Sequence, residues 1–128
     1  MTLKIIVKGR ENGKVMVAKK PINFLGAIDK KTGKVRDQKH DLFNKSLADR
    51  ILVFPYGVGS SVGAYTIYSL KSNKCAPKAM ICLRADLTTV SGCALANIPL
   101  VVVTQDDYNS LKDGMEIFLD AENGIISE

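Results

Sequence analysis

The residues of this 128-residue chain best suited to chemistry are two adjacent serines, Ser60 and Ser61. They lie in the glycine-rich stretch Gly57-Val58-Gly59-Ser60-Ser61-Val62-Gly63. A glycine-rich loop that leads into a helix gathers backbone N–H groups, and such groups bind anions. The first question that the sequence raises is therefore what these two hydroxyls do.

The elements on either side of the loop are predicted from their apolar patterns. Ile51–Pro55 is an apolar run bounded by Pro and Gly, which indicates a buried strand. Residues 64–70 place Ala64, Ile67, Tyr68 and Leu70 at roughly helical spacing, which indicates a short helix. The sequence thus predicts a strand, a Gly/Ser loop and a helix in succession.

A hydrolase site is one interpretation of the loop. Gly59–Gly63 matches the G-x-S-x-G pattern with Ser61 at its centre, between a strand and a helix. That chemistry needs a histidine base later in the chain. The only histidine, His40, precedes the serine. The sequence therefore disfavours a hydrolase.

Three other interpretations remain open on the residues alone. The loop lacks the Lys-Ser/Thr ending of a P-loop, so it could bind an anion without hydrolysing a nucleotide. One serine could act as a general base if loop amides and a helix N-terminus stabilise its alkoxide. The third interpretation is purely structural: a tight strand-to-helix turn in which a serine caps the helix.

Composition indicates one ordinary globular domain over residues 1–128. Hydrophobic residues make up 46% and charged residues 24% of the chain. No apolar run approaches the ~20 residues that span a membrane. Lysines interrupt the N-terminal stretch Met1–Lys8 too early for a signal peptide. We expect a cytoplasmic protein.

The three cysteines do not have the spacing of a metal site. Cys75, Cys82 and Cys93 form no C-x-x-C pair, and their number is odd. A disulfide framework or a self-contained zinc or iron–sulfur site is therefore not expected. We expect buried free thiols and no metal bound by this chain.

Charge is distributed unevenly along the chain. Residues 1–50 carry 13 Lys and Arg but 5 Asp and Glu, whereas residues 51–128 carry 5 and 8. Few aromatic residues stand among the cations, so nucleic-acid binding is not expected. A solvated face, or attraction to an anionic substrate or an acidic partner, is the favoured interpretation.

The remaining elements predict a mixed α/β fold with a barrel-like or open central sheet. Strands are expected at Leu3–Val7, Val15–Ala18, Phe24–Ile28, Ala79–Leu83 and Ile98–Val103, a helix at Leu87–Ala96 with Asp86 as its N-cap, and a helical turn at Asp106–Leu111. Asn12-Gly13 predicts an N-terminal hairpin, and Asn123-Gly124 predicts a closing hairpin of Met115–Leu119 with Gly124–Ser127.

Several stretches together resemble the small subunit of the aconitase X family. They are Pro21–Asp29, Ile51–Pro55, Gly59–Tyr65, Ala76–Ala79 and Ala96–Val101. They occur in the family's order, and the resemblance covers most of residues 3–103. It implies a swivelling β/β/α domain like the mobile domain of aconitases.

The resemblance also implies a partner and a reaction. A large subunit would hold a 4Fe–4S cluster through its own cysteines, and the iron would act as a Lewis acid on the leaving hydroxyl. The short archaeal branch implies dehydration of (R)-5-phosphomevalonate to trans-anhydromevalonate 5-phosphate in a modified mevalonate pathway for isoprenoids. Relatives with both parts fused act on hydroxyproline-type substrates. Another hydroxy acid, or a non-catalytic anion-binding or scaffold role, therefore stays open.

The resemblance assigns roles to individual loop residues. In aconitases the first serine of the Gly-Ser-Ser loop is the base, and this position is Ser60 here. Gly59, Ser61 and Gly63 are then expected to bind substrate, with Ser61 as the alternative base. Aconitases carry an arginine two residues after the catalytic serine. This chain has Val62 there, and the aconitase X branch also lacks the arginine, so another residue or the large subunit must supply the cation.

Overall fold

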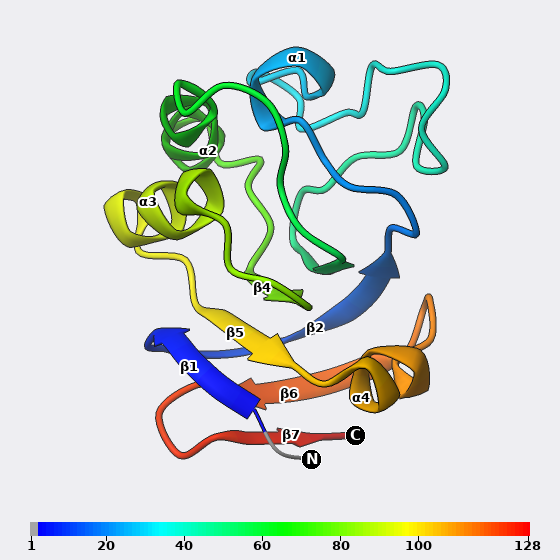
Figure 1. The fold of residues 1–128 in the computed structure, drawn as a ribbon, viewed down its shortest axis with the longest axis vertical. Coiled ribbons are helices and arrows are strands. Elements are labelled where there is room, and N and C mark those ends of the chain that lie inside the picture. Colours follow the sequence, from blue (N-terminus) through cyan, green and yellow to red (C-terminus); the bar gives the residue numbers. More distant parts are fainter. Residues whose placement is uncertain (1–2) are drawn as a thin grey trace.

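The computed structural model describes residues 3–128, so residues 1 and 2 of the expected domain lie outside it. Seven strands form one sheet: β1 (Leu3–Val7), β2 (Arg10–Val17), β3 (Arg50–Phe54), β4 (Ala79–Cys82), β5 (Leu100–Val103), β6 (Glu116–Asp120) and β7 (Ile125–Ser127). Four helices accompany them: α1 (Phe24–Ala27), α2 (Gly63–Ser72), α3 (Leu87–Ala96) and α4 (Gln105–Ser110) (Figure 1).

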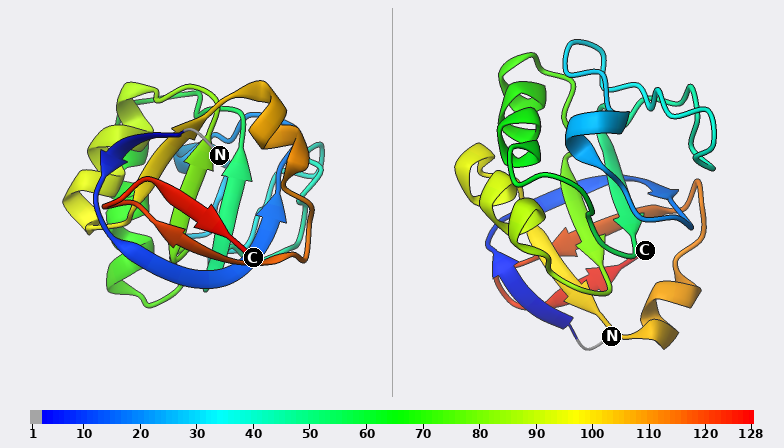
Figure 2. Two further views of the ribbon diagram at one scale, coloured as in Figure 1. Left: turned by 90° about the horizontal axis from the view of Figure 1, so that it is seen from below. Right: turned by 45° about the horizontal axis from the view of Figure 1, so that its top comes forward.

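The sheet combines a parallel centre with antiparallel edges. Its strand order is β1-β5-β4-β3-β2-β6-β7. Strands β2 to β5 run parallel to their neighbours, whereas β1 pairs antiparallel with β5, and β6 with both β2 and β7. Figure 2 shows the strands curling around a common axis. The expected mixed α/β fold with a barrel-like sheet and short helices is confirmed.

The central strands are buried on both faces, as parallel strands usually are. Side chains alternate between the faces along β3. Ile51 and Val53 join the cluster inside the curled sheet, with Leu119 of β6. Leu52 and Phe54 join the cluster under the helices. The unbroken apolar run of β3 thus fills two hydrophobic cores.

Helices α2 and α3 lie side by side on the outer face of the sheet (Figure 1). Helix α2 buries Ala64, Ile67 and Leu70 of the predicted apolar set, whereas Tyr68 is exposed. Helix α3 begins at Asp86, whose side chain accepts a hydrogen bond from the Thr89 N–H, as predicted for its N-cap. Both helices start at the carboxyl ends of the strands that precede them.

The predicted N-terminal hairpin is wrong. Strand β1 pairs with β5, and β2 pairs with β3 and β6. Asn12 and Gly13 lie inside β2, opposite Phe118 and Ile117 of β6. Pairing with β6 keeps the chain extended through a dipeptide that otherwise favours a turn.

The strand predicted at Phe24–Ile28 is also wrong, because residues 24–27 form the short helix α1. Asn23 caps it by accepting the Gly26 N–H at 3.0 Å. The Phe24 ring packs edge-on against Phe54 of β3, with ring centroids 5.9 Å apart. An N-cap and one buried aromatic therefore outweigh the β propensity of the stretch.

The other predicted elements are confirmed within a few residues. The closing hairpin is formed by β6 and β7. The helical turn near residue 106 is α4, and the central strand, loop and helix are β3, the Gly/Ser loop and α2. Among residues 3–128 there is no helix with the length and apolar character needed to cross a bilayer.

Candidate active-site loop

The Gly/Ser loop, residues 57–62, leaves the carboxyl end of β3 and leads into α2. Its first residues pair with the segment that follows β2. The Ile22 N–H donates to the Tyr56 carbonyl at 3.1 Å, and the Val58 N–H donates to the Ile22 carbonyl at 2.9 Å. The carboxyl edge of a parallel sheet is where α/β proteins bind ligands. The loop is therefore fixed to this edge before it reaches the serines.

Asp86 ties the loop to the start of α3. Its Oδ1 accepts the Gly57 N–H at 2.7 Å, while its Oδ2 accepts the Thr89 N–H at 3.0 Å. A Cβ built on Gly57 would lie 2.6 Å from Thr89 Oγ1, so only glycine fits this approach. The sequence identified Asp86 as a helix cap, but its bond to a loop 29 residues earlier needed the structure.

Asn23, at the start of α1, lies directly against the bend of the loop. Gly59 has a φ of +92°, a backbone conformation that glycine adopts without strain. A Cβ on Gly59 would lie 2.6 Å from Asn23 Oδ1, the atom that accepts the Gly26 N–H at the start of α1. The Asn23 side chain that caps α1 therefore fills the space that any side chain at position 59 would need.

The two serines differ in their hydrogen bonds. Ser60 Oγ accepts the Val62 N–H at 3.1 Å. Within residues 3–128 we find no hydrogen bond to the Ser61 hydroxyl. Both residues are exposed. The N-cap residue of α2 is Val62, which makes no side-chain cap bond. The bond from the Val62 N–H to Ser60 Oγ instead stabilises the turn directly before the helix, as the structural interpretation also predicts for a serine there.

Several exposed apolar side chains flank the serines in the chain or belong to the segments that approach the start of α2. They are Leu25, Val58, Val62, Tyr65 and Leu87, with exposed fractions from 42% for Val58 to 74% for Leu87, and we call them the apolar rim. Three elements meet at the start of α2, because a Cβ on Gly63 would lie within 3.3 Å of both Thr88 Cγ2 and the Leu25 N. Large exposed apolar patches mark interaction sites.

An aromatic–cation pair stands at the same edge. The Arg84 guanidinium lies over the Tyr56 ring, 4.0 Å from its centroid. Such contacts contribute about 0.5–1 kcal/mol at exposed sites. Tyr56 directly precedes the Gly/Ser loop, and Arg84 follows β4. Sequence reasoning missed this pair, since nothing in the local pattern brings the two residues together.

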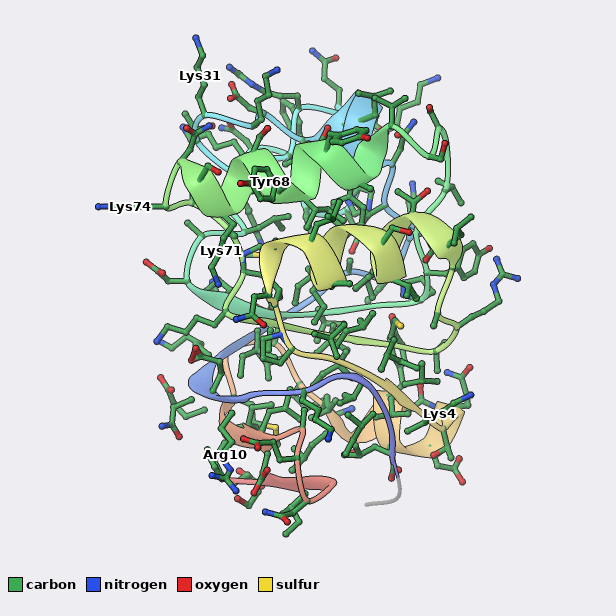
Figure 3. All side chains as sticks on the ribbon, turned by 90° about the vertical axis from the view of Figure 1, so that its left-hand side faces the viewer. Lys4, Arg10, Lys31, Tyr68, Lys71 and Lys74 are labelled. Atoms are coloured by element: carbon green, nitrogen blue, oxygen red, sulfur yellow. The ribbon has the colours of Figure 1, made fainter. Side chains whose placement is uncertain are left out.

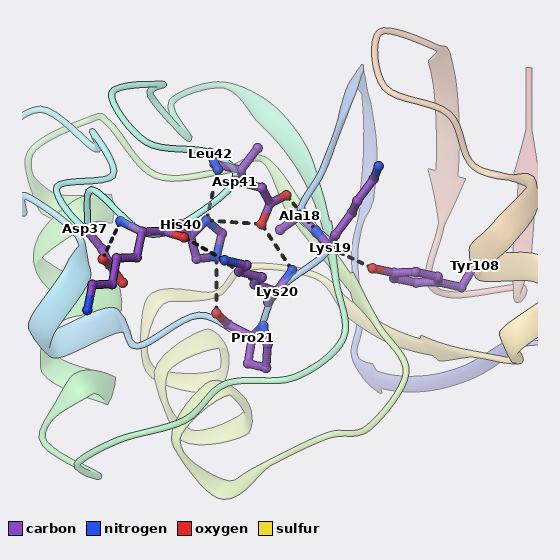
Figure 4. A network of polar contacts seen from close by, with 10 residues as sticks. Ala18, Lys19, Lys20, Pro21, Asp37, His40, Asp41, Leu42 and Tyr108 are labelled. Atoms are coloured by element: carbon purple, nitrogen blue, oxygen red, sulfur yellow. Dashed lines mark hydrogen bonds and ion pairs between the residues drawn. The ribbon is translucent and has the colours of Figure 1, made fainter.

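His40 does not belong to the loop's chemistry. Its Nδ1 accepts the Leu42 N–H at 3.0 Å, so the proton is on Nε2, which lies 3.1 Å from the Pro21 carbonyl (Figure 4). The imidazole is buried and both ring nitrogens are engaged. It holds the segment that carries Asn23 and offers no base to Ser61.

The cysteines are unsuited to hold a cluster. Cys75, Cys82 and Cys93 are buried free thiols. Burial raises the pKa of the Cys82 thiol to about 12 and also raises the pKa of Cys93. Within residues 3–128 no group of three or more His, Cys, Asp or Glu could hold a metal ion. The residues of this chain therefore do not fit an iron–sulfur cluster.

The cations of the chain are dispersed. Figure 3 shows Lys4, Arg10, Lys31 and Lys74 on different parts of the surface. Lys71 and Lys74 lie at the C-terminal end of α2, opposite the serines. There they line a pocket of about 300 Å³ that also includes acidic side chains, Glu11 and Asp49.

Comparisons with known proteins agree on one family. The model of the aconitase X swivel domain matches residues 1–128. A relative from Thermococcus kodakarensis named phosphomevalonate dehydratase small subunit is 44% identical over 93% of this chain and 88% of its own. One of the same name from Methanothermobacter thermautotrophicus is 40% identical over 96% and 95%.

A solved structure of the same family has nearly the same fold. The crystal structure of Thermococcus kodakaraensis aconitase X in its holo-form aligns with a TM-score of 0.92 and 43% identity. The alignment covers 100% of this chain and 99% of that one.

Proposed function

The chain belongs to the aconitase X swivel-domain family, and from this premise we propose that it is the small subunit of a phosphomevalonate dehydratase. Such an enzyme is a hydro-lyase. It would remove water from (R)-5-phosphomevalonate to give trans-anhydromevalonate 5-phosphate. The relatives' shared name supports this assignment at 37% to 44% identity over most of the chain.

The small subunit is proposed to work only with a large one. The apolar rim exposes five large side chains, and their burial by a partner would favour assembly. The 4Fe–4S cluster that the aconitase X resemblance implies is proposed to lie in that partner, held by its own cysteines. This chain would then contribute the Gly/Ser loop to a site shared between the subunits.

Ser60 is proposed to act as the general base. A serine hydroxyl is a weak acid, so its alkoxide needs donors and positive charge nearby. Ser60 Oγ already accepts the Val62 N–H, and it precedes the positive N-terminal end of α2. This hydrogen bond, which Ser61 lacks, is the observation that favours Ser60.

The proposed step is a proton transfer. The Ser60 alkoxide takes a proton from the substrate carbon next to the carboxylate. The substrate then loses the hydroxyl of the next carbon as hydroxide, which leaves a carbon–carbon double bond. The hydroxide takes up one proton to leave as water, and Ser60 gives up its proton to restore the alkoxide, so the net change is the loss of one water. Gly59 and Gly63 keep the backbone close to the substrate, because neither carries a side chain, and the exposed Ser61 hydroxyl is available to bind it.

Reconstitution tests the proposal. Purified small and large subunits, mixed with (R)-5-phosphomevalonate, are expected to form the product only together. S60A is expected to lower turnover by at least ~100-fold, the size of a general-base contribution, while the complex still assembles. S61A is the matched comparison: because Ser61 is assigned to substrate binding, S61A is expected to raise KM and to lower kcat far less than S60A does. Turnover by the large subunit alone would contradict the proposal, and an active S60A with an inactive S61A would transfer the role to Ser61.

A further inference from the structure

Arg84 stands on the same rigid framework as the serines. The Leu83 and Arg84 N–H groups both donate to the Pro55 carbonyl, at 3.0 and 3.2 Å. Two residues further on, Asp86 accepts the Gly57 N–H. Hydrogen bonds at residues 83, 84 and 86 thus join the segment that follows β4 to the segment that follows β3. Its position relative to the Gly/Ser loop is set by backbone hydrogen bonds rather than by a flexible tether.

The guanidinium of Arg84 stacks on Tyr56 but donates no hydrogen bond to any group within residues 3–128. Arg10 pairs with Asp120, Arg36 pairs with Asp29, and Arg50 donates to backbone carbonyls. Among residues 3–128, Arg84 has no such acceptor. Stacking on Tyr56 engages one face of the guanidinium and leaves its N–H edge available.

We propose that Arg84, oriented by Tyr56, binds an anionic group of the substrate at the site that Ser60 serves. A guanidinium presents paired N–H donors that match a carboxylate or a phosphate in a bidentate geometry. Prior orientation by an aromatic ring reduces the entropy lost on binding. The inference rests on the proposed function, since a phosphorylated hydroxy acid carries both kinds of anion.

The test measures binding without turnover. Assembled enzyme carrying S60A is titrated with (R)-5-phosphomevalonate by calorimetry, alone and combined with R84A, R84K or K78A. Lys78 is an exposed cation that precedes β4, at the opposite end of the strand that Arg84 follows. R84A is expected to weaken binding by about 10- to 100-fold, the range for a hydrogen-bonded charge. R84K is expected to restore part of the loss, and K78A to change nothing.

Mevalonate, which lacks the phosphate, identifies the anion. If Arg84 binds the phosphate, R84A weakens binding of phosphomevalonate but not of mevalonate. If it binds the carboxylate, both ligands weaken alike. Either result supports the inference when R84K also restores part of the lost affinity, because a merely structural loss would not be repaired by a second cation at this position.

Two results would overturn the inference. In the first, R84A binds phosphomevalonate as tightly as its parent. In the second, R84A prevents the subunits from assembling, which would make Arg84 an interface residue. The proposed function is judged separately by turnover of the wild-type complex. A complex that bound phosphomevalonate without dehydrating it would contradict that function, whereas the titrations would still decide the role of Arg84.

Discussion

The Gly/Ser loop and the β6–β7 turn are built from the same kinds of residue but differ in what holds them. Each contains a glycine with positive φ, +92° at Gly59 and +76° at Gly124. Each also depends on an aspartate that accepts backbone N–H groups. Asp120 accepts those of Glu122 and Asn123, both at 3.0 Å, whereas Asp86 reaches a loop 29 residues away.

The difference shows how a loop is prepared for chemistry. In the β6–β7 turn, Asp120 accepts hydrogen bonds from N–H groups of the same turn, so the turn stabilises itself. The Gly/Ser loop is held from outside by hydrogen bonds to Ile22 and Asp86 and lies against Asn23, and both serine residues are exposed. A functional group on a loop needs such external support to keep a fixed position.

The largest difference between the two regions is expected when alanine replaces the positive-φ glycine in each. G59A places a Cβ 2.6 Å from Asn23 Oδ1 and adds backbone strain at positive φ, so we expect the loop to shift. Turnover of the assembled enzyme should fall by about 10- to 100-fold, as misplaced catalytic groups do. The free energy of unfolding should fall by about 1–3 kcal/mol.

G124A is the control for that substitution. Its Cβ would have only Leu3 Cδ1 nearby, at 4.0 Å, so strain alone remains. We expect about 1 kcal/mol of destabilisation and unchanged turnover. Chemical denaturation and steady-state kinetics measure both quantities. Equal losses of turnover in the two variants would mean that the loop is no more sensitive than an ordinary turn.

A smaller effect is expected at Asp120. Hydrogen bonds from the Asn123 side chain, opposed by burial and assisted by the Glu122 N–H and the Arg10 guanidinium, hold the pKa of the Asp120 carboxyl below its usual range. The stability it contributes is therefore present above the unfolded-state pKa of about 4 and is lost as pH falls through the lowered folded-state pKa.

D120N removes that contribution. We expect its Tm to lie below the wild-type value at pH 7 and the gap to narrow below about pH 4, where the wild-type carboxyl begins to lose its advantage. Thermal melts across this range measure the gap, and turnover of the assembled enzyme should not change. A constant gap at all pH values would argue against a role for the carboxylate charge.

The same dipeptide shows what the sequence predicts and what it does not. Asn123-Gly124 forms a hairpin turn as predicted, because the chain reverses there to add β7 as an edge strand beside β6. Asn12-Gly13 stays extended, because both residues pair with β6. Local turn preference decides the first case, and pairing with strands distant in sequence decides the second.

The candidate site divides in a similar way. The Gly/Ser loop, its strand and its helix are predicted from residues adjacent in the chain. Asn23 and Arg84 are missed because their contacts, with Gly59 and Tyr56, exist only after β2, β3 and β4 have paired. Because the sequence predicts a strand at Phe24–Ile28, it also misses that Asn23 is the N-cap of a helix and lies against Gly59.

Exchange of the substrate's own hydrogen tests most directly whether Ser60 takes the proton. The assembled enzyme is incubated with (R)-5-phosphomevalonate in D2O, and deuterium at the carbon next to the carboxylate is followed by NMR. We predict that wild type and S61A incorporate deuterium at similar rates and that S60A is at least ~100-fold slower. Incorporation by S60A at the wild-type rate would contradict the assignment of Ser60 as the base.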